Sequence, residues 1–164
     1  MRPWRPADES VVRNIRAYYG INHFPRGIML VSTGKRLRAV TEEAYELAKR
    51  LKGVVGLGVY AAKKFGENYY FSIEGSQIFG DHIENRVVEV TWEEAEQWMK
   101  GAPIKREGAE PRSIIVVRLG RVYLGSGKVS RDGKIYPLIP RERQRVERDG
   151  EEVPHANMPI RDKD

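Results

Sequence analysis

The 164-residue sequence contains no cysteine, and this absence excludes several kinds of chemistry. Disulfide bonds, zinc ribbons, iron–sulfur clusters and thiol nucleophiles all need a cysteine sulfur. No apolar run approaches the roughly 20 residues of a membrane span. The opening residues, Met-Arg-Pro-Trp-Arg-Pro, also lack the apolar stretch of a signal peptide. These absences predict a cytoplasmic protein that does not enter a membrane.

Recognisable catalytic signatures are scarce as well. The three histidines, His23, His82 and His155, are far apart and show no metal-binding spacing. Gly56-Leu-Gly-Val-Tyr-Ala61 fits the dinucleotide pattern G-x-G-x-x-A, but the segment after it is too short for the helix that this pattern requires. Gly125-Ser-Gly-Lys128 has valine after the lysine, where a P-loop has Ser or Thr. We therefore expect no catalytic residues, no metal site and no cofactor.

The positive charge is concentrated in one segment of the chain. The net charge is +6, and residues 101–150 contain twelve Lys and Arg against six Asp and Glu, an excess equal to that of the whole chain. A basic segment on a nearly neutral body is typical of a protein that contacts a polyanion. The alternative is a solvated cationic surface without a partner. A charged fraction of 32% with few glutamines also favours a thermophilic source.

Helix and strand signals alternate along the first hundred residues. Asp8 and Gly20 flank an apolar helical pattern at 9–19, and Thr41 opens a second helix that we expect to end at Gly53. Thr91-Trp-Glu-Glu94 is a capping box for a further helix that continues through Lys100. The remaining signals predict a weaker helix at 72–82 and strands at 28–32, 54–62 and 86–90.

Short strands and turns dominate the segment after the capped helix. We expect strands at 113–118, 122–124 and 128–130, with a glycine turn between the last two, and Asp132-Gly133 predicts a hairpin. The polar residues from Arg148 onward indicate a flexible tail. The whole pattern predicts an α+β fold with an α/β N-terminal part (1–85), a small barrel-like β domain (86–147) and the tail (148–164).

The candidate site lies where glycines, tyrosines and cations are closely spaced. Glycine leaves room for a phosphate backbone, and Lys and Arg supply the counter-charge. We expect Leu124-Gly-Ser-Gly-Lys128 to form a turn that RNA approaches closely, with tyrosines beside it stacking on bases. The predicted RNA-binding residues are Arg121, Tyr123, Gly125, Gly127, Lys128, Arg131, Lys134, Tyr136, Arg141, Arg143 and Arg145.

Residues 112–145 resemble the PUA-like C-terminal region of the Sun/Fmu (Nol/Nop/Sun) RNA cytosine-5 methyltransferases. The shared pattern is a strand, an aliphatic-Gly-x-Gly-Lys segment, a glycine hairpin and a basic close that contains Tyr136-Pro137. Residues 91–104 are similar to the helix before this module, and residues 56–65 to an earlier glycine–lysine stretch. The resemblance does not extend to the methyltransferase domain, which uses two cysteines. The resemblance implies a stand-alone, archaeal, PUA-like RNA-binding protein that acts in rRNA or tRNA maturation.

Three functions stay open on these residues. The first, which we predict, is non-catalytic binding of rRNA or tRNA in ribosome biogenesis or RNA modification. The second is an adapter that docks onto a separate RNA methyltransferase or ribosomal protein through the helix with Trp92 and Trp98, or through the N-terminal part. The third is a small enzyme that acts on nucleotides or RNA with carboxylates near Glu74, Asp81 and Glu84.

Overall fold

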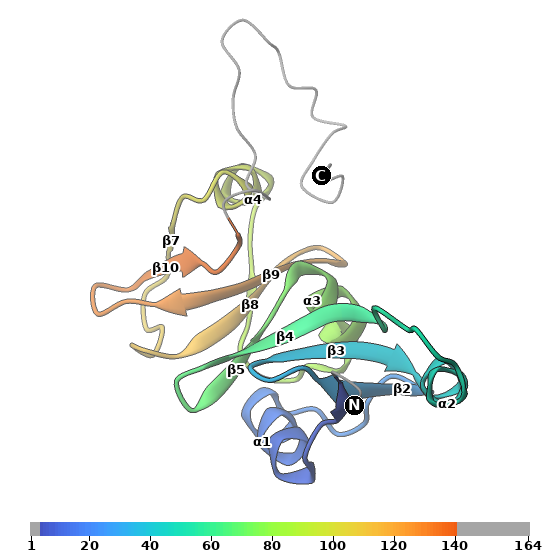
Figure 1. Cartoon of the computed structure of the whole chain (residues 1–164). Helices are drawn as coiled ribbons and strands as arrows, with labels where there is room; N and C mark the ends of the chain where they lie inside the picture. Colours follow the sequence, from blue (N-terminus) through green and yellow to red (C-terminus); the bar gives the residue numbers. More distant parts are fainter. Residues whose placement is uncertain (1–3, 141–164) are drawn as a thin grey trace, which may run out of the picture. The chain divides into compact units, whose positions relative to one another are not determined.

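The chain divides into two compact units with a boundary between Arg86 and Val87, in a computed structural model that describes residues 4–140. Each unit contains its own five-stranded sheet, with three α-helices in the first unit and one in the described part of the second (Figure 1). The predicted α+β class with a barrel-like β part is confirmed, since one of the two sheets is a curled half-barrel. The sequence placed the boundary after residue 85.

The first unit is built on an antiparallel sheet in which each strand pairs with the next one along the chain. Its strands are β1 (Arg5–Pro6), β2 (Ile28–Ser32), β3 (Arg36–Thr41), β4 (Val59–Phe65) and β5 (Asn68–Phe71). Its helices are α1 (Glu9–Tyr19), α2 (Glu42–Arg50) and α3 (Ile73–Phe79), and the 3-10 turn η1 (Gly80–His82) follows α3.

Both faces of this sheet carry packed side chains. On one face, Val31 and Val40 pack with Ala48 of α2 and with Trp4. On the other face, the Phe71 ring lies 4.8 Å from the Tyr19 ring of α1 and 5.3 Å from the Phe79 ring of α3, measured between ring centroids. Helix α2 therefore belongs to one face of the sheet, and helices α1 and α3 to the other.

Local signals account for the helix ends of the first unit. Helix α1 has the predicted bounds, because Gly20 adopts the left-handed conformation that ends a helix (φ 66°). The Thr41 side chain accepts a hydrogen bond from the Ala44 amide and so caps α2, as predicted. Helix α2 ends earlier than predicted, because Leu51 is already extended two residues before Gly53.

The second unit combines one helix with a mixed sheet in the order β6-β8-β9-β10-β7. Strand β6 pairs parallel to β8, and the other neighbours are antiparallel. The capping box at Thr91 is present, with both of its hydrogen bonds, and opens the helix. The elements are β6 (Val87–Glu89), α4 (Trp92–Met99), β7 (Ile104–Lys105), β8 (Ile114–Leu119), β9 (Val122–Val129) and β10 (Lys134–Pro137).

The predicted glycine turn at 124–128 is wrong, because β9 continues through it, with an irregularity in the pairing with β8 at Gly125, which takes a left-handed conformation (φ 83°). The indole of Trp98 is fully buried, and its Nε1 donates a hydrogen bond to the Leu124 carbonyl at 2.9 Å. A Cβ on Gly127 would lie 2.7 Å from the Ile135 side chain and closer still to the Trp98 ring. Gly127 is therefore required to make room for tryptophan packing, which does not need a turn.

Candidate functional site

Two strand pairings gather cations and an aromatic ring on one side of the second sheet. Lys134 of β10 stands directly opposite Lys105 of β7, and Lys128 of β9 stands directly opposite Tyr136 of β10. Directly opposite residues point to the same side of a sheet, and so do residues two apart in one strand. The side chains of Lys105, Lys128, Lys134 and Tyr136 therefore share one side, and all four are exposed.

A turn adds a fifth member, and we name the set Lys105, Lys128, Arg131, Lys134 and Tyr136 the basic face. Arg131 lies in the four-residue connection between β9 and β10 and is exposed. Asp132 accepts hydrogen bonds from the Ser130 hydroxyl and from the Lys134 amide, and these bonds hold its pKa below the ordinary value. This hairpin confirms the one predicted from Asp132-Gly133, and Gly133 takes the left-handed conformation (φ 83°).

The opposed lysines of the basic face, Lys105 and Lys134, repel each other when no ligand is bound. Like charges directly opposite each other in a sheet are destabilising, by roughly 0.2–1 kcal/mol per pair. A bound polyanion reverses this effect, because one phosphate between two ammonium groups is attracted to both. The Lys105–Lys134 pair therefore favours an anionic ligand more specifically than net charge does.

Several predicted site residues do not reach this face. Gly125 and Gly127 are buried within β9, and Tyr123 is only 5% exposed, so its ring does not offer a stacking surface to RNA. Arg121 is exposed but precedes β9, seven residues before Lys128. At about 3.3 Å per residue this separates the two positions by about 23 Å. The predicted contacts at Arg141, Arg143 and Arg145 lie outside the described residues.

Two cations of the second unit are held in ion pairs inside the fold. The Arg106 guanidinium donates to both carboxylate oxygens of Glu94, at 2.6 and 2.8 Å, and to the Glu89 carbonyl at 2.8 Å. Arg118 pairs with the Glu89 carboxylate at 2.7 Å. These contacts tie α4, β6 and β8 together, so we assign Arg106 and Arg118 to stability and leave them out of the basic face.

The Arg106–Glu94 pair predicts a pH dependence of stability. The hydrogen bond from Arg106 is the main reason that the pKa of Glu94 falls to about 2 from an ordinary value of 4.5. A depressed pKa stabilises the fold above the unfolded-state pKa, and this contribution is lost as the pH falls through the folded-state pKa. Replacing Glu94 with Gln should lower the free energy of unfolding at pH 7, and the difference from the unmodified protein should shrink between about pH 5 and pH 2. Urea unfolding across this range measures it; a difference that does not change with pH would contradict the assignment.

The carboxylates weighed for an enzyme do not form a recognisable catalytic arrangement. Glu74 lies in the first turn of α3, Asp81 in η1, and Glu84 two residues beyond that turn. Within residues 4–140, no group of three or more His, Cys, Asp or Glu side chains is placed to hold a metal ion. The segment with Gly56 and Gly58 leads into strand β4, whereas a dinucleotide fingerprint needs a helix there.

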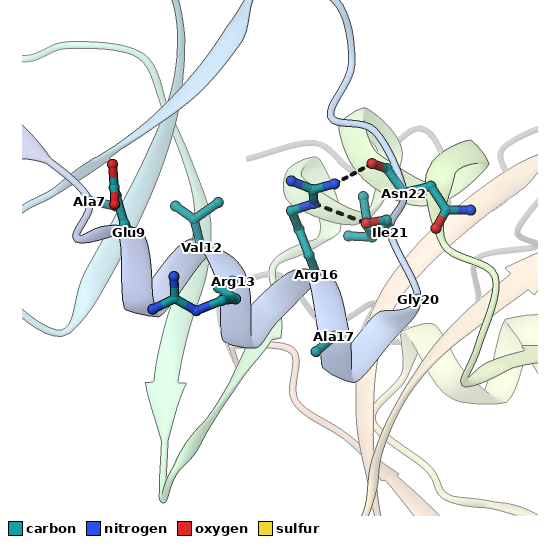
Figure 2. A pocket seen from close by; sticks show the side chains of 9 residues that line it. All are labelled: Ala7, Glu9, Val12, Arg13, Arg16, Ala17, Gly20, Ile21 and Asn22. Carbon is teal, nitrogen blue, oxygen red and sulfur yellow. Dashed lines mark hydrogen bonds between the residues drawn. The ribbon is translucent and has the colours of Figure 1, made fainter.

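An open groove of about 660 Å³ runs along α1 (Figure 2). Arg16 closes its C-terminal end by donating to the carbonyls of Ile21, at 3.1 Å, and Asn22. Glu9 is the one carboxylate among the nine lining residues, so the groove offers no pair of carboxylates for acid–base chemistry.

Comparisons with protein-family models and with curated proteins give no match for this chain. The likeness to the PUA-like region therefore rests on the sequence motifs alone. As to membranes, no helix in the described part of the chain has both the length and the apolar character to cross a bilayer.

Proposed function

We propose that the protein is a non-catalytic RNA-binding protein that holds rRNA or tRNA on its basic face. The observation that carries the proposal is the register of β7, β9 and β10. It sets three lysines around Tyr136, whose side chain remains 44% exposed. A solvated cationic surface does not require an exposed aromatic ring at its centre, whereas RNA recognition combines cations with stacking platforms.

The chemistry of the basic face suits an unpaired stretch of RNA. Each lysine that neutralises a phosphate releases counterions, so log affinity falls with log salt by about 0.7 per contact on a single strand. Stacking of one base on Tyr136 adds about 1–3 kcal/mol. Neither interaction depends strongly on base identity, so we expect the basic face alone to bind with little sequence preference.

The resemblance to the PUA-like region of RNA methyltransferases supplies the biological setting of the proposal. That likeness supports a role in ribosome biogenesis or RNA modification in the cytoplasm of an archaeal thermophile. In that setting, a separate methyltransferase acts on the RNA that this protein holds. The basic face provides the contact with RNA in either case.

A second candidate function, an adapter, is favoured by exposed apolar side chains. Trp92 of α4 is 36% exposed, whereas its predicted companion Trp98 is buried. In the first unit, Leu47, Leu51 and Val55 are all exposed near the C-terminal end of α2. Apolar groups of this kind favour a protein partner, and such docking is compatible with RNA binding on the basic face.

The proposal is tested by fluorescence-anisotropy titration of the full chain against an RNA stem-loop with a single-stranded end. DNA of the same sequence is the control. We expect micromolar or tighter binding to RNA and weaker binding to DNA. Equal and weak binding to both would overturn the proposal and leave the adapter as the better account.

A further inference from the structure

A strand irregularity gives the first unit a second surface with unusual composition. The pairing of β3 with β4 passes from Leu37–Ala62 to Arg38–Tyr60, so Ala61 is the additional residue of a β-bulge. In a regular strand, residues 60 and 63 point to opposite sides. The bulge removes this difference and puts Tyr60 on the same side as Lys63.

Three aromatic rings and two cations meet on that side, and we name Arg36, Tyr60, Lys63, Phe65 and Tyr70 the aromatic face. Burial raises the pKa of Tyr60 above its ordinary value, and the interaction of its hydroxyl with that of Tyr70 adds to this effect. The Phe65 and Tyr70 rings meet edge to face at 6.0 Å between centroids. The Arg36 guanidinium lies 5.0 Å from the centroid of the Tyr60 ring.

The helices of the first unit pack elsewhere. Phe71, which alternates with Tyr70 along β5, packs against α1 and α3 on the opposite side of the sheet. Helix α2 packs over Val31 and Val40, at the β2–β3 part of the sheet. Figure 1 shows α2 at the other end of the sheet from the turn that joins β4 to β5. The three rings of the aromatic face are accordingly only half-buried within residues 4–140.

The charges around the three rings indicate which ligand the aromatic face binds. Arg36 and Lys63 stand directly opposite each other, so this surface repeats the like-charge cross-strand pairing of the basic face. One carboxylate, Glu74 of α3, is also near Tyr60, so the two cations outnumber it. Flat rings flanked by an excess of cations match unpaired bases joined by phosphates, because every base has a face that stacks and every linkage carries a negative charge.

We propose that the aromatic face binds a single-stranded segment of RNA, with bases stacked on Tyr60, Phe65 and Tyr70 and phosphates held by Arg36 and Lys63. This inference does not rest on the basic face, since it uses a different sheet in a different unit. It requires no movement of the rings, because their mutual contacts already hold them in place. Unpaired bases, and not duplex, are the ligand.

The test uses the full chain carrying Lys105→Gln, Lys128→Gln, Lys134→Gln and Tyr136→Ser, which weakens both the charge and the stacking surface of the basic face. The probes are a fluorescent eight-nucleotide oligouridine and the same ribose–phosphate backbone without bases. Tyr60→Leu with Tyr70→Leu removes two rings and retains apolar side chains. Tyr45→Leu, on α2, is the matched control. We expect the protein to prefer the probe with bases, and the double variant to bind that probe at least about tenfold more weakly and to lose the preference. The control should retain both.

Two results would overturn the proposal: equal affinity for both probes before any ring is removed, or an unchanged preference in a folded Tyr60→Leu, Tyr70→Leu variant. Circular dichroism establishes whether that variant folds. If it does not, Arg36→Gln with Lys63→Gln replaces it, because Arg36 is exposed and Lys63 is only partly buried. That variant should lower the salt slope by about 1.4, from two phosphate contacts; an unchanged slope would also overturn the proposal. If the basic face does not bind RNA, these expectations still hold, because every protein in this test already carries the substitutions that weaken that face.

Discussion

A protein with Lys105→Glu, Lys128→Glu and Lys134→Glu should bind single-stranded RNA at least about 100-fold more weakly than the unmodified protein at about 0.15 M salt. Each change removes an attraction for phosphate and adds a repulsion, so the effect should exceed that of three neutral substitutions. The three side chains are exposed, and Lys105 and Lys134 already repel each other, so the fold should tolerate the changes. Anisotropy titration measures the loss.

The matched control for this prediction reverses three other exposed cations. Arg26→Glu, Arg50→Glu and Lys52→Glu change the net charge by the same amount, but they lie in the first unit outside the basic and aromatic faces. We expect the control to lose much less affinity, through the long-range field alone. Equal losses in both triple variants would mean that net charge governs binding and that the register of β7, β9 and β10 does not define a site.

The largest effect on stability is expected for Trp98→Ala, at about 3–5 kcal/mol. The indole is fully buried against Gly127 and Ile135, and its removal also leaves the Leu124 carbonyl without its donor. Urea unfolding followed by far-UV circular dichroism measures the loss. Trp92→Ala is the control on the same helix, since that side chain is exposed and should cost about 1 kcal/mol or less. Similar losses for both variants would show that Trp98 does not hold the second unit together.

Features fixed by neighbouring residues were predictable from the sequence. The C-terminal end of α1 follows from Gly20, and the start of α4 follows from a capping box within four residues. The β9–β10 hairpin follows from Asp132-Gly133 in the same way. In each case the residues that determine the geometry are adjacent in the chain, so a local pattern contains the required information.

The glycines of β9 show where a local pattern misleads. Glycine favours turns because it tolerates unusual backbone angles, and two glycines within three residues therefore predicted a turn. Gly127 instead makes room for Trp98, which lies 29 positions earlier in the chain. Apolar residues on both sides of the glycines, and a tryptophan upstream that needs a buried position, are also compatible with a strand. Only the tertiary packing decides between a strand and a turn.

Strand register explains why the sites were only partly predicted. Lys128, Arg131, Lys134 and Tyr136 were found because they are close together in sequence, whereas Lys105 was missed because β7 reaches β10 only through the sheet. The aromatic face was missed for a related reason. Tyr60 joins Lys63 and Tyr70 through a bulge, which reverses the side expected from simple alternation.

The salt dependence of RNA binding tests the central claim most directly. The full chain and a Lys128→Ala, Arg131→Ala variant are titrated with the same single-stranded RNA at several salt concentrations, and log affinity is plotted against log salt. If both side chains contact phosphates, the variant should bind at least about tenfold more weakly, with a slope shallower by about 1.4. Unchanged affinity with an identical slope would contradict the placement of RNA on the basic face.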